Sequence, residues 1–220
     1  MTENGWDIVL LGGASGVGKS RAAARLAGAS GAFVVEFDDV VSAVQETTTA
    51  AQHPQLHLFA GLPDPDGLPA AQVLELQIAT ARALEPAMLG VVRNRLTVDV
   101  PAVVEGDYLT PAAAALAVEA GRAAGRSVRA VFLHEPDAAR ITANYAAREP
   151  GCGTQAQRAE VSSRYSHWLA GQARRYALPV VACRPWDTFD ARLGAALRTD
   201  SPTPAGSRAL GTPAEVRYVS

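Results

Sequence analysis

The chain has 220 residues, of which 48% are hydrophobic and 19% charged, a composition typical of a globular protein and not of a disordered one. Its 20 Lys+Arg and 22 Asp+Glu residues give a formal net charge of -2 at pH 7, which does not support attraction of the whole surface to nucleic acid or anionic lipid. Cys152 and Cys183 lie far apart in the sequence, which disfavours a disulfide framework and a thiolate metal site. Apolar runs are too short to span a bilayer, so we expect a cytoplasmic protein without a membrane partner.

Five short apolar segments alternate with helical patterns along the chain. The predicted strands cover residues 6–11, 32–37, 101–106, 127–134 and 178–183. Helical periodicity between 70 and 96 is interrupted at Pro86, which predicts two helices. This alternation predicts an α/β fold with a parallel sheet covered by helices on both faces. We expect one domain over 1–198 and, because 199–220 is rich in Pro, Ser, Thr and Gly, a flexible tail.

A phosphate-binding loop follows the first predicted strand and precedes a helix. Its motif, G-x-x-x-x-G-K-S, comprises Gly13, Ala14, Ser15, Gly16, Val17, Gly18, Lys19 and Ser20. Backbone N–H groups of such a loop turn inward around phosphates, which requires the open backbone angles of glycine. The Lys19 ammonium then reaches the β- and γ-phosphates, and the Ser20 hydroxyl is placed to ligate Mg²⁺.

Lys19 is also the only lysine in the chain, against 19 arginines. Arginine therefore serves wherever a positive charge alone is needed, while one position kept a compact ammonium that a planar guanidinium does not replace. The solitary lysine also excludes an NKxD motif, which requires a second lysine and is typical of GTPases. A small-molecule kinase fits the chain length better than an ATPase motor.

Acidic residues follow the second and third predicted strands. Asp38 is the preferred base for an acceptor hydroxyl, with Asp39 as the second candidate; the alternative role for either is the N-cap of the next helix. Glu105 and Asp107 stand where a carboxylate holds the hydration shell of Mg²⁺ or a substrate hydroxyl. We assign Glu105 to the metal and place Asp107, with Asp38 and Asp39, on the substrate.

Arginines and a tryptophan complete the predicted site. Arg140 and Arg148 lie two turns apart on one predicted helix, followed by a glycine-containing segment suited to a hinge, so this segment is expected to close over the nucleotide as a lid. Arg148 is the preferred catalytic arginine, the alternative being a solvated surface charge. Pro185 and Trp186 follow the fifth strand, where Trp186 either stacks on the base or caps the core.

Four segments resemble the small bacterial P-loop kinases: GASGVGKS, the Asp38–Asp39 pair, VVEGDYLTP, and the helix near FLHEPDAARITANYAARE. Among these kinases the 2-phosphoglycerate kinase-like proteins and chloramphenicol phosphotransferase are the nearest, with gluconate kinase and shikimate kinase as broader relatives. The resemblance covers about residues 6–197. It implies a P-loop NTPase fold with five parallel strands in the order 2-3-1-4-5, a lid and an acceptor-binding helical region. We place the lid at about 136–165 and the acceptor-binding region at about 47–100; the latter residues match the acceptor pocket of none of these families, which leaves the substrate open.

The sequence thus predicts an ATP-dependent kinase, with GTP as the alternative nucleotide and Mg²⁺ as cofactor, that phosphorylates a hydroxyl of a small molecule. Both a metabolite and an antibiotic remain open as acceptor, and Arg82 is expected on the acceptor wall. We expect a monomer or homodimer without nucleic acid bound. Two alternatives remain: a nucleotide-binding regulatory ATPase module, and a kinase acting on a nucleotide sugar or a nucleic-acid end.

Overall fold

The computed structural model describes residues 5–60, 62 and 67–198, and the predicted tail at 199–220 lies outside them. Five strands form one sheet in the order β2-β3-β1-β4-β5, with every neighbouring pair parallel. The strands are β1 (Ile8–Gly13), β2 (Phe33–Glu36), β3 (Ala102–Gly106), β4 (Val128–His134) and β5 (Val180–Ala182). The predicted P-loop NTPase fold and strand order are therefore confirmed.

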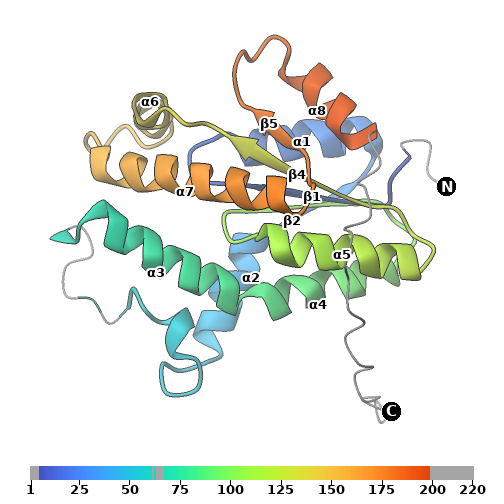
Figure 1. The fold of residues 1–220 in the computed structure, drawn as a ribbon, viewed down its shortest axis with the longest axis horizontal. Coiled ribbons are helices and arrows are strands. Elements are labelled where there is room, and N and C mark those ends of the chain that lie inside the picture. Colours follow the sequence, from blue (N-terminus) through green and yellow to red (C-terminus); the bar gives the residue numbers. More distant parts are fainter. Residues whose placement is uncertain (1–4, 61, 63–66, 199–220) are drawn as a thin grey trace.

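Helices cover both faces of this sheet (Figure 1). They are α1 (Lys19–Ser30), α2 (Phe37–Glu46), α3 (Ala70–Ala83), α4 (Glu85–Leu96), α5 (Pro111–Ala123), α6 (Ala138–Arg148), α7 (Ala156–Arg175) and α8 (Phe189–Arg198), with a short 3-10 turn, η1, at Pro54–Leu56. Helices α1 and α8 lie on one face, and α5 and α7 on the other, with α3 and α4 packed beneath them. The break predicted at Pro86 falls at Leu84, between α3 and α4.

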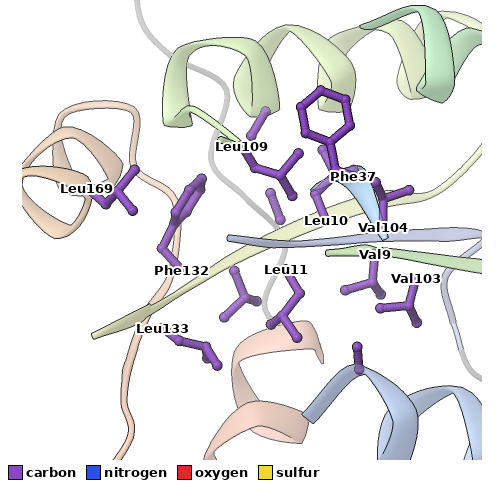
Figure 2. Packing of buried hydrophobic residues seen from close by; sticks show 14 of the residues in the cluster. Val9, Leu10, Leu11, Phe37, Val103, Val104, Leu109, Phe132, Leu133 and Leu169 are labelled. Atoms are coloured by element: carbon purple, nitrogen blue, oxygen red, sulfur yellow. The ribbon is translucent and has the colours of Figure 1, made fainter. Parts of the chain in front are cut away.

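The core is built from strand residues that alternate between the two faces. Figure 2 shows Val9 and Val103 directed toward the α1 side and Leu10 and Val104 toward the opposite side. The β1 and β3 segments are buried along their whole length, because both faces of a central parallel strand are covered. This packing fixes the carboxyl edge of β1 and β3, from which the P-loop and the acidic residues emerge.

Local features refine these predictions. The helices do not cover the second strand completely: Phe33 is 59% and Val34 40% exposed, because β2 lies at the edge of the sheet. Helix α2 begins at Phe37 with Glu36 as its N-cap, so Asp38 and Asp39 lie in its first turn and neither is the cap. Asp137 caps α6 by accepting a hydrogen bond from the Ala139 N–H at 2.9 Å.

Candidate nucleotide and acceptor site

The P-loop joins the end of β1 to the start of α1 and has a left-handed backbone at two glycines. Gly16 has φ 75° and Gly18 φ 96°, and Gly18 forms the N-cap of α1. A β-carbon at Gly18 would lie 2.7 Å from the Trp186 ring, and one at Gly16 would lie 2.9 Å from Tyr145. Both positions therefore require glycine for backbone conformation and for space. The loop leaves the N-terminal N–H groups of α1 free for an anion.

Lys19 lies buried at the base of the loop, 6% exposed. Its Nζ donates to the carbonyl oxygen of Ala14 at 3.0 Å and forms a short ion pair with the Asp107 carboxylate. Burial by itself would lower the pKa of Lys19, but the carboxylates of Asp107, Glu105 and Asp38 outweigh it and raise that pKa. The Lys19 ammonium is therefore charged, and it pairs with the Asp107 carboxylate in the position where it would otherwise bind a phosphate.

Asp38 stands in the first turn of α2, next to the end of β3. Desolvation, helped by the negative charge of Asp107, raises the pKa of Asp38 to about 6, although Lys19 and a hydrogen bond from the Asp107 backbone act in the opposite direction. A carboxylate with a pKa near neutrality is suited to accept a proton from a hydroxyl. Both Asp38 and its neighbour Asp39 are exposed, but Asp38 lines the first of the two cavities described below, whereas Asp39 lines neither.

Glu105 and Ser20 form the part of the site suited to a cation. Glu105 is 4% exposed at the end of β3 and accepts a hydrogen bond from the Ser20 hydroxyl. Burial raises the pKa of Glu105, while the Ser20 hydrogen bond and Lys19 oppose that rise. A hydroxyl backed by a buried carboxylate offers the oxygen donors that Mg²⁺ prefers, so these two residues fit the predicted metal role. Within the described ranges, no group of three or more His, Cys, Asp and Glu side chains could hold a metal ion by itself.

Helix α6 lies over the P-loop and is attached to it. The Asn144 side-chain amide donates to the Gly16 carbonyl oxygen at 2.8 Å, and Tyr145 packs beside that glycine. The buried Tyr145 hydroxyl is in turn 2.9 Å from the Ser162 hydroxyl of α7. This contact holds the predicted lid helix against the phosphate loop. Sequence reasoning missed Asn144 as a site residue, because an asparagine within a helix carries no signal of its own.

Two arginines of the lid meet at one glutamate. Arg148 contacts Glu149 through Nε at 2.9 Å and a terminal nitrogen at 2.5 Å, and Arg158 of α7 contacts the other Glu149 oxygen at 2.9 Å. Hydrogen bonds from Arg148 and Gln155 lower the pKa of this carboxyl. The Arg158 guanidinium also lies 4.3 Å from the centre of the Tyr145 ring. Glu149 thus holds both arginines at the mouth of the site, where its single negative charge offsets only one of their two positive charges.

Trp186 packs between the P-loop and α8. Its ring lies close to Gly18 and meets Phe189 edge-on at a centroid distance of 5.0 Å. Trp186 also lines the first of the two cavities described below, so its ring both packs against the core and lies where it can face a nucleotide base. Pro185 does not line that cavity, and its carbonyl oxygen accepts a hydrogen bond from Arg192 at 2.6 Å. Arg140 lies outside it too, 3.3 Å from Asp137 and 3.7 Å from the buried Glu135.

Two adjoining cavities meet above the P-loop. The first, which we name the nucleotide cavity, has a volume of about 450 Å³ and is lined by Ser15, Gly16, Gly18, Lys19, Ser20, Arg21, Asp38, Asp107, Asn144, Arg148, Arg158 and Trp186. The second, named the acceptor cavity, has about 320 Å³ and lies between α3, α7 and the loop after β3. Ser15, Asp107 and Arg158 line both cavities.

The structure thus brings together much, but not all, of the predicted site. Gly13, Ala14 and Val17 are buried beneath the loop, where the Ala14 carbonyl holds Lys19. Arg82 of α3 does not line either cavity; its guanidinium lies over the Trp168 ring, 5.9 Å from the centroid. The amides of Gln77 and Gln157 line the acceptor cavity and were missed, because their spacing in the sequence carries no motif. No helix in the described part of the chain is long and apolar enough to cross a membrane.

Solved structures share this fold. A gluconokinase from Sinorhizobium meliloti 1021 superposes with a TM-score of 0.54 at 18% identity, covering 88% of this chain and 91% of that one. A shikimate kinase from Bacteroides thetaiotaomicron has a TM-score of 0.49 at 12% identity, covering 87% and 98%. TT1252 from Thermus thermophilus gives 0.49 at 17% identity, covering 87% and 96%. At these identities the likeness concerns the fold.

No curated protein matches the chain significantly. A family model described as an AAA domain matches residues 8–167, which include the P-loop, the acidic residues after β2 and β3, and the lid helix. The match spans well over half of the chain, and the structure supplies the phosphate loop that the family description implies. This chain therefore belongs to that AAA domain family.

Proposed function

We propose that the protein is an ATP-dependent kinase that transfers the γ-phosphate to a hydroxyl of a small molecule. The observation that supports this most strongly is the junction of the two cavities. One contains the phosphate loop, the other contains no phosphate-binding motif, and Asp107 and Ser15 line both. A nucleotidase needs only the first cavity, whereas a transferase needs a second compartment at the position of the γ-phosphate.

In this proposal the P-loop and Lys19 hold the β- and γ-phosphates. Phosphate binding draws the Lys19 ammonium away from Asp107, whose carboxylate then faces the acceptor cavity and orients the hydroxyl. Asp38 takes the hydroxyl proton as the acceptor oxygen forms its bond to phosphorus and the bond from phosphorus to the β,γ-bridging oxygen breaks, so that ADP leaves. Arg148 leaves Glu149 and stabilises the charge that develops on the transferred group.

Ser20, with Glu105 behind it, would hold Mg²⁺. When bound, the cation neutralises charge on the phosphate oxygens. ATP is the preferred nucleotide and GTP the alternative, with Trp186 beside the base. The finer resemblance to 2-phosphoglycerate kinase-like proteins and to chloramphenicol phosphotransferase is part of this proposal, and leaves both a metabolite and an antibiotic as the source of the hydroxyl.

The experiment is a screen of hydroxyl compounds with ATP and Mg²⁺, read by ADP release and by mass detection of a phosphorylated product. Lys19→Ala is the matched inactive control. A new product with the mass of one added phosphoryl group, absent with the control variant, supports the kinase. ADP release that no acceptor stimulates and that yields only inorganic phosphate would instead favour a regulatory nucleotide-binding module.

A further inference from the structure

The acceptor cavity has one apolar wall. Phe59 precedes α3, Val73 belongs to α3, and Val161 faces them from α7. The volume of about 320 Å³ corresponds to about ten water molecules, which is enough for a small organic ligand. Displacing water from this wall favours a ligand with an apolar part, since apolar surface removed from water stabilises the complex.

Apart from Asp107 and Arg158, the polar side chains of the cavity are neutral amides and hydroxyls. The Gln77 amide and the Tyr108 hydroxyl make no hydrogen bond to any residue that the structure describes, so both are available to a ligand. Burial raises the pKa of Tyr108 to about 12, which keeps its hydroxyl as a donor. Gln157 uses its amide nitrogen to bind the Leu68 carbonyl at 2.6 Å, leaving its carbonyl oxygen as an acceptor. Such groups suit alcohols, amides and esters.

The charges around the cavity disfavour an anionic acceptor. Arg158 is the one cation among the described residues that line it, and its terminal nitrogen is shared between Glu149 at 2.9 Å and Gln155 at 2.6 Å. Asp107 is the opposing charge, and it is neutralised only while Lys19 pairs with it. Once phosphate attracts Lys19, a carboxylate in the acceptor cavity would face Asp107, and the one cation beside it among the described lining residues would be Arg158, which is already paired with Glu149.

The neighbouring helix α3 does not supply a second cation. Arg82, on the same helix as Gln77, lies over Trp168 and outside the cavity. Binding of a sugar acid or a phosphorylated acceptor would therefore bring negative charge beside Asp107, with only the already paired Arg158 to offset it among the described lining residues.

We propose that the acceptor is an uncharged hydroxyl compound with an apolar part, seated between the Gln77 and Gln157 amides and the Phe59, Val73 and Val161 wall. That this ligand is the acceptor of a phosphoryl group rests on the proposed function, whereas the class of ligand is inferred from the residues that line the cavity. It separates this chain from kinases whose acceptors carry a carboxylate or phosphate, because the one cation among the described residues that line this cavity, Arg158, is already paired with Glu149.

The test uses two matched pairs of compounds and reads binding independently of catalysis. Sorbitol is compared with gluconate, and styrene glycol with mandelate, by saturation-transfer NMR on the full chain with a non-hydrolysable ATP analogue. We expect the neutral member of each pair to bind better, and styrene glycol better than sorbitol. Preference for gluconate or mandelate, or no binding by either neutral compound, overturns the proposal.

A charge introduced into the cavity should reverse this preference. Gln77→Arg places a cation beside the ligand and is expected to shift the affinity ratio of mandelate to styrene glycol by about tenfold or more, since a hydrogen bond to a charged group is worth at least that factor. Gln72→Arg, on the exposed side of the same helix, is the control and should leave the ratio unchanged. An equal shift in both variants also overturns the proposal. Neutral compounds that bind but are never phosphorylated would count against the kinase function and leave the ligand class standing.

Discussion

At the scale of single residues, Lys19 carries the strongest prediction. It is buried, it is the only lysine of the chain, and its Nζ contacts both the Ala14 carbonyl and Asp107. Lys19→Ala should abolish phosphoryl transfer, and Lys19→Arg should reduce kcat by about 10²-fold or more, because a guanidinium is too large for a loop closed around phosphate. Transfer rates of both variants check this. Near-normal activity of Lys19→Arg would refute the argument from the solitary lysine.

Asp38 gives a prediction on pH. With a pKa of about 6, its carboxyl is protonated and unable to accept a proton at lower pH. The kcat/KM for ATP, which reports the free enzyme, should therefore rise with pH through about 6 in the wild type. Asp38→Asn should lose this rise and retain about 10⁻² of the rate or less. An unchanged rate in this variant would pass the role to Asp107, to be tested by Asp107→Asn.

The same pKa bears on stability. Because folding raises the pKa of Asp38 from 3.8 to about 6, the folded state binds more protons than the unfolded state between these values. The free energy of unfolding is therefore lowered progressively as pH rises from about 4 to about 6, and the full destabilisation persists above pH 6. Asp38→Asn removes that charge, so it should raise the Tm more at pH 7.5 than at pH 4.5. Thermal melts of both proteins at the two pH values measure this, and a lower Tm of the variant at pH 7.5 contradicts it.

At the scale of elements, α6 connects the phosphate loop to the lid arginines. Its Asn144 binds the Gly16 carbonyl, while Arg148 at its last position pairs with Glu149. Arg148→Ala should lower kcat by about 10²-fold and change nucleotide affinity much less, because the arginine acts on charge that develops during transfer. Steady-state kinetics and nucleotide titration separate the two effects.

The control for Arg148 is Arg122→Ala. Arg122 is an exposed residue in the last turn of α5, paired with Glu119 at 2.9 Å. It lies shortly before the amino end of β4, whereas the P-loop follows the carboxyl end of β1. It should retain wild-type kinetics. If Arg148→Ala behaves like Arg122→Ala, then Arg148 is a surface residue whose pairing with Glu149 has no part in transfer.

At the scale of the whole molecule, the nucleotide cavity joins segments from most of the chain. It includes the P-loop, α2, the end of β3, α6, α7 and the loop after β5. ATP at about 100 times its Kd should add about 2.7 kcal/mol to the free energy of unfolding, a Tm increase of about 5–10 °C for a chain of this size. Thermal melts with and without ATP check this, and Lys19→Ala should lose most of the increase. No shift in the wild type at saturating ATP would argue against nucleotide binding.

How much the sequence revealed differs between the fold and the site. The strand positions, the sheet's parallel character and the P-loop follow from local patterns, because apolar runs, glycines and a lysine at fixed spacing have few other uses. The predicted second strand included Phe37, which the structure places at the start of α2. An apolar aromatic residue after an apolar run is typical of a strand, and only its packing, fully buried, against Gly106 shows its place in the helix. Pairwise spacing likewise favoured Arg140 with Arg148, whereas Arg148 and Arg158 from two helices meet at Glu149.

By itself, the sequence determined the P-loop, the identity of Lys19 and the placement of Asp38, Glu105 and Asp107 after their strands, since each is written in contiguous residues. Only the tertiary structure decided that Asp107 lines both cavities, that Arg82 lies outside them, and that Gln77 from α3 and Gln157 from α7 flank one compartment. These contacts join positions many residues apart, and the packing of α3 against α7 that creates them depends on side-chain shapes along both helices. No local pattern in the chain encodes that pairing.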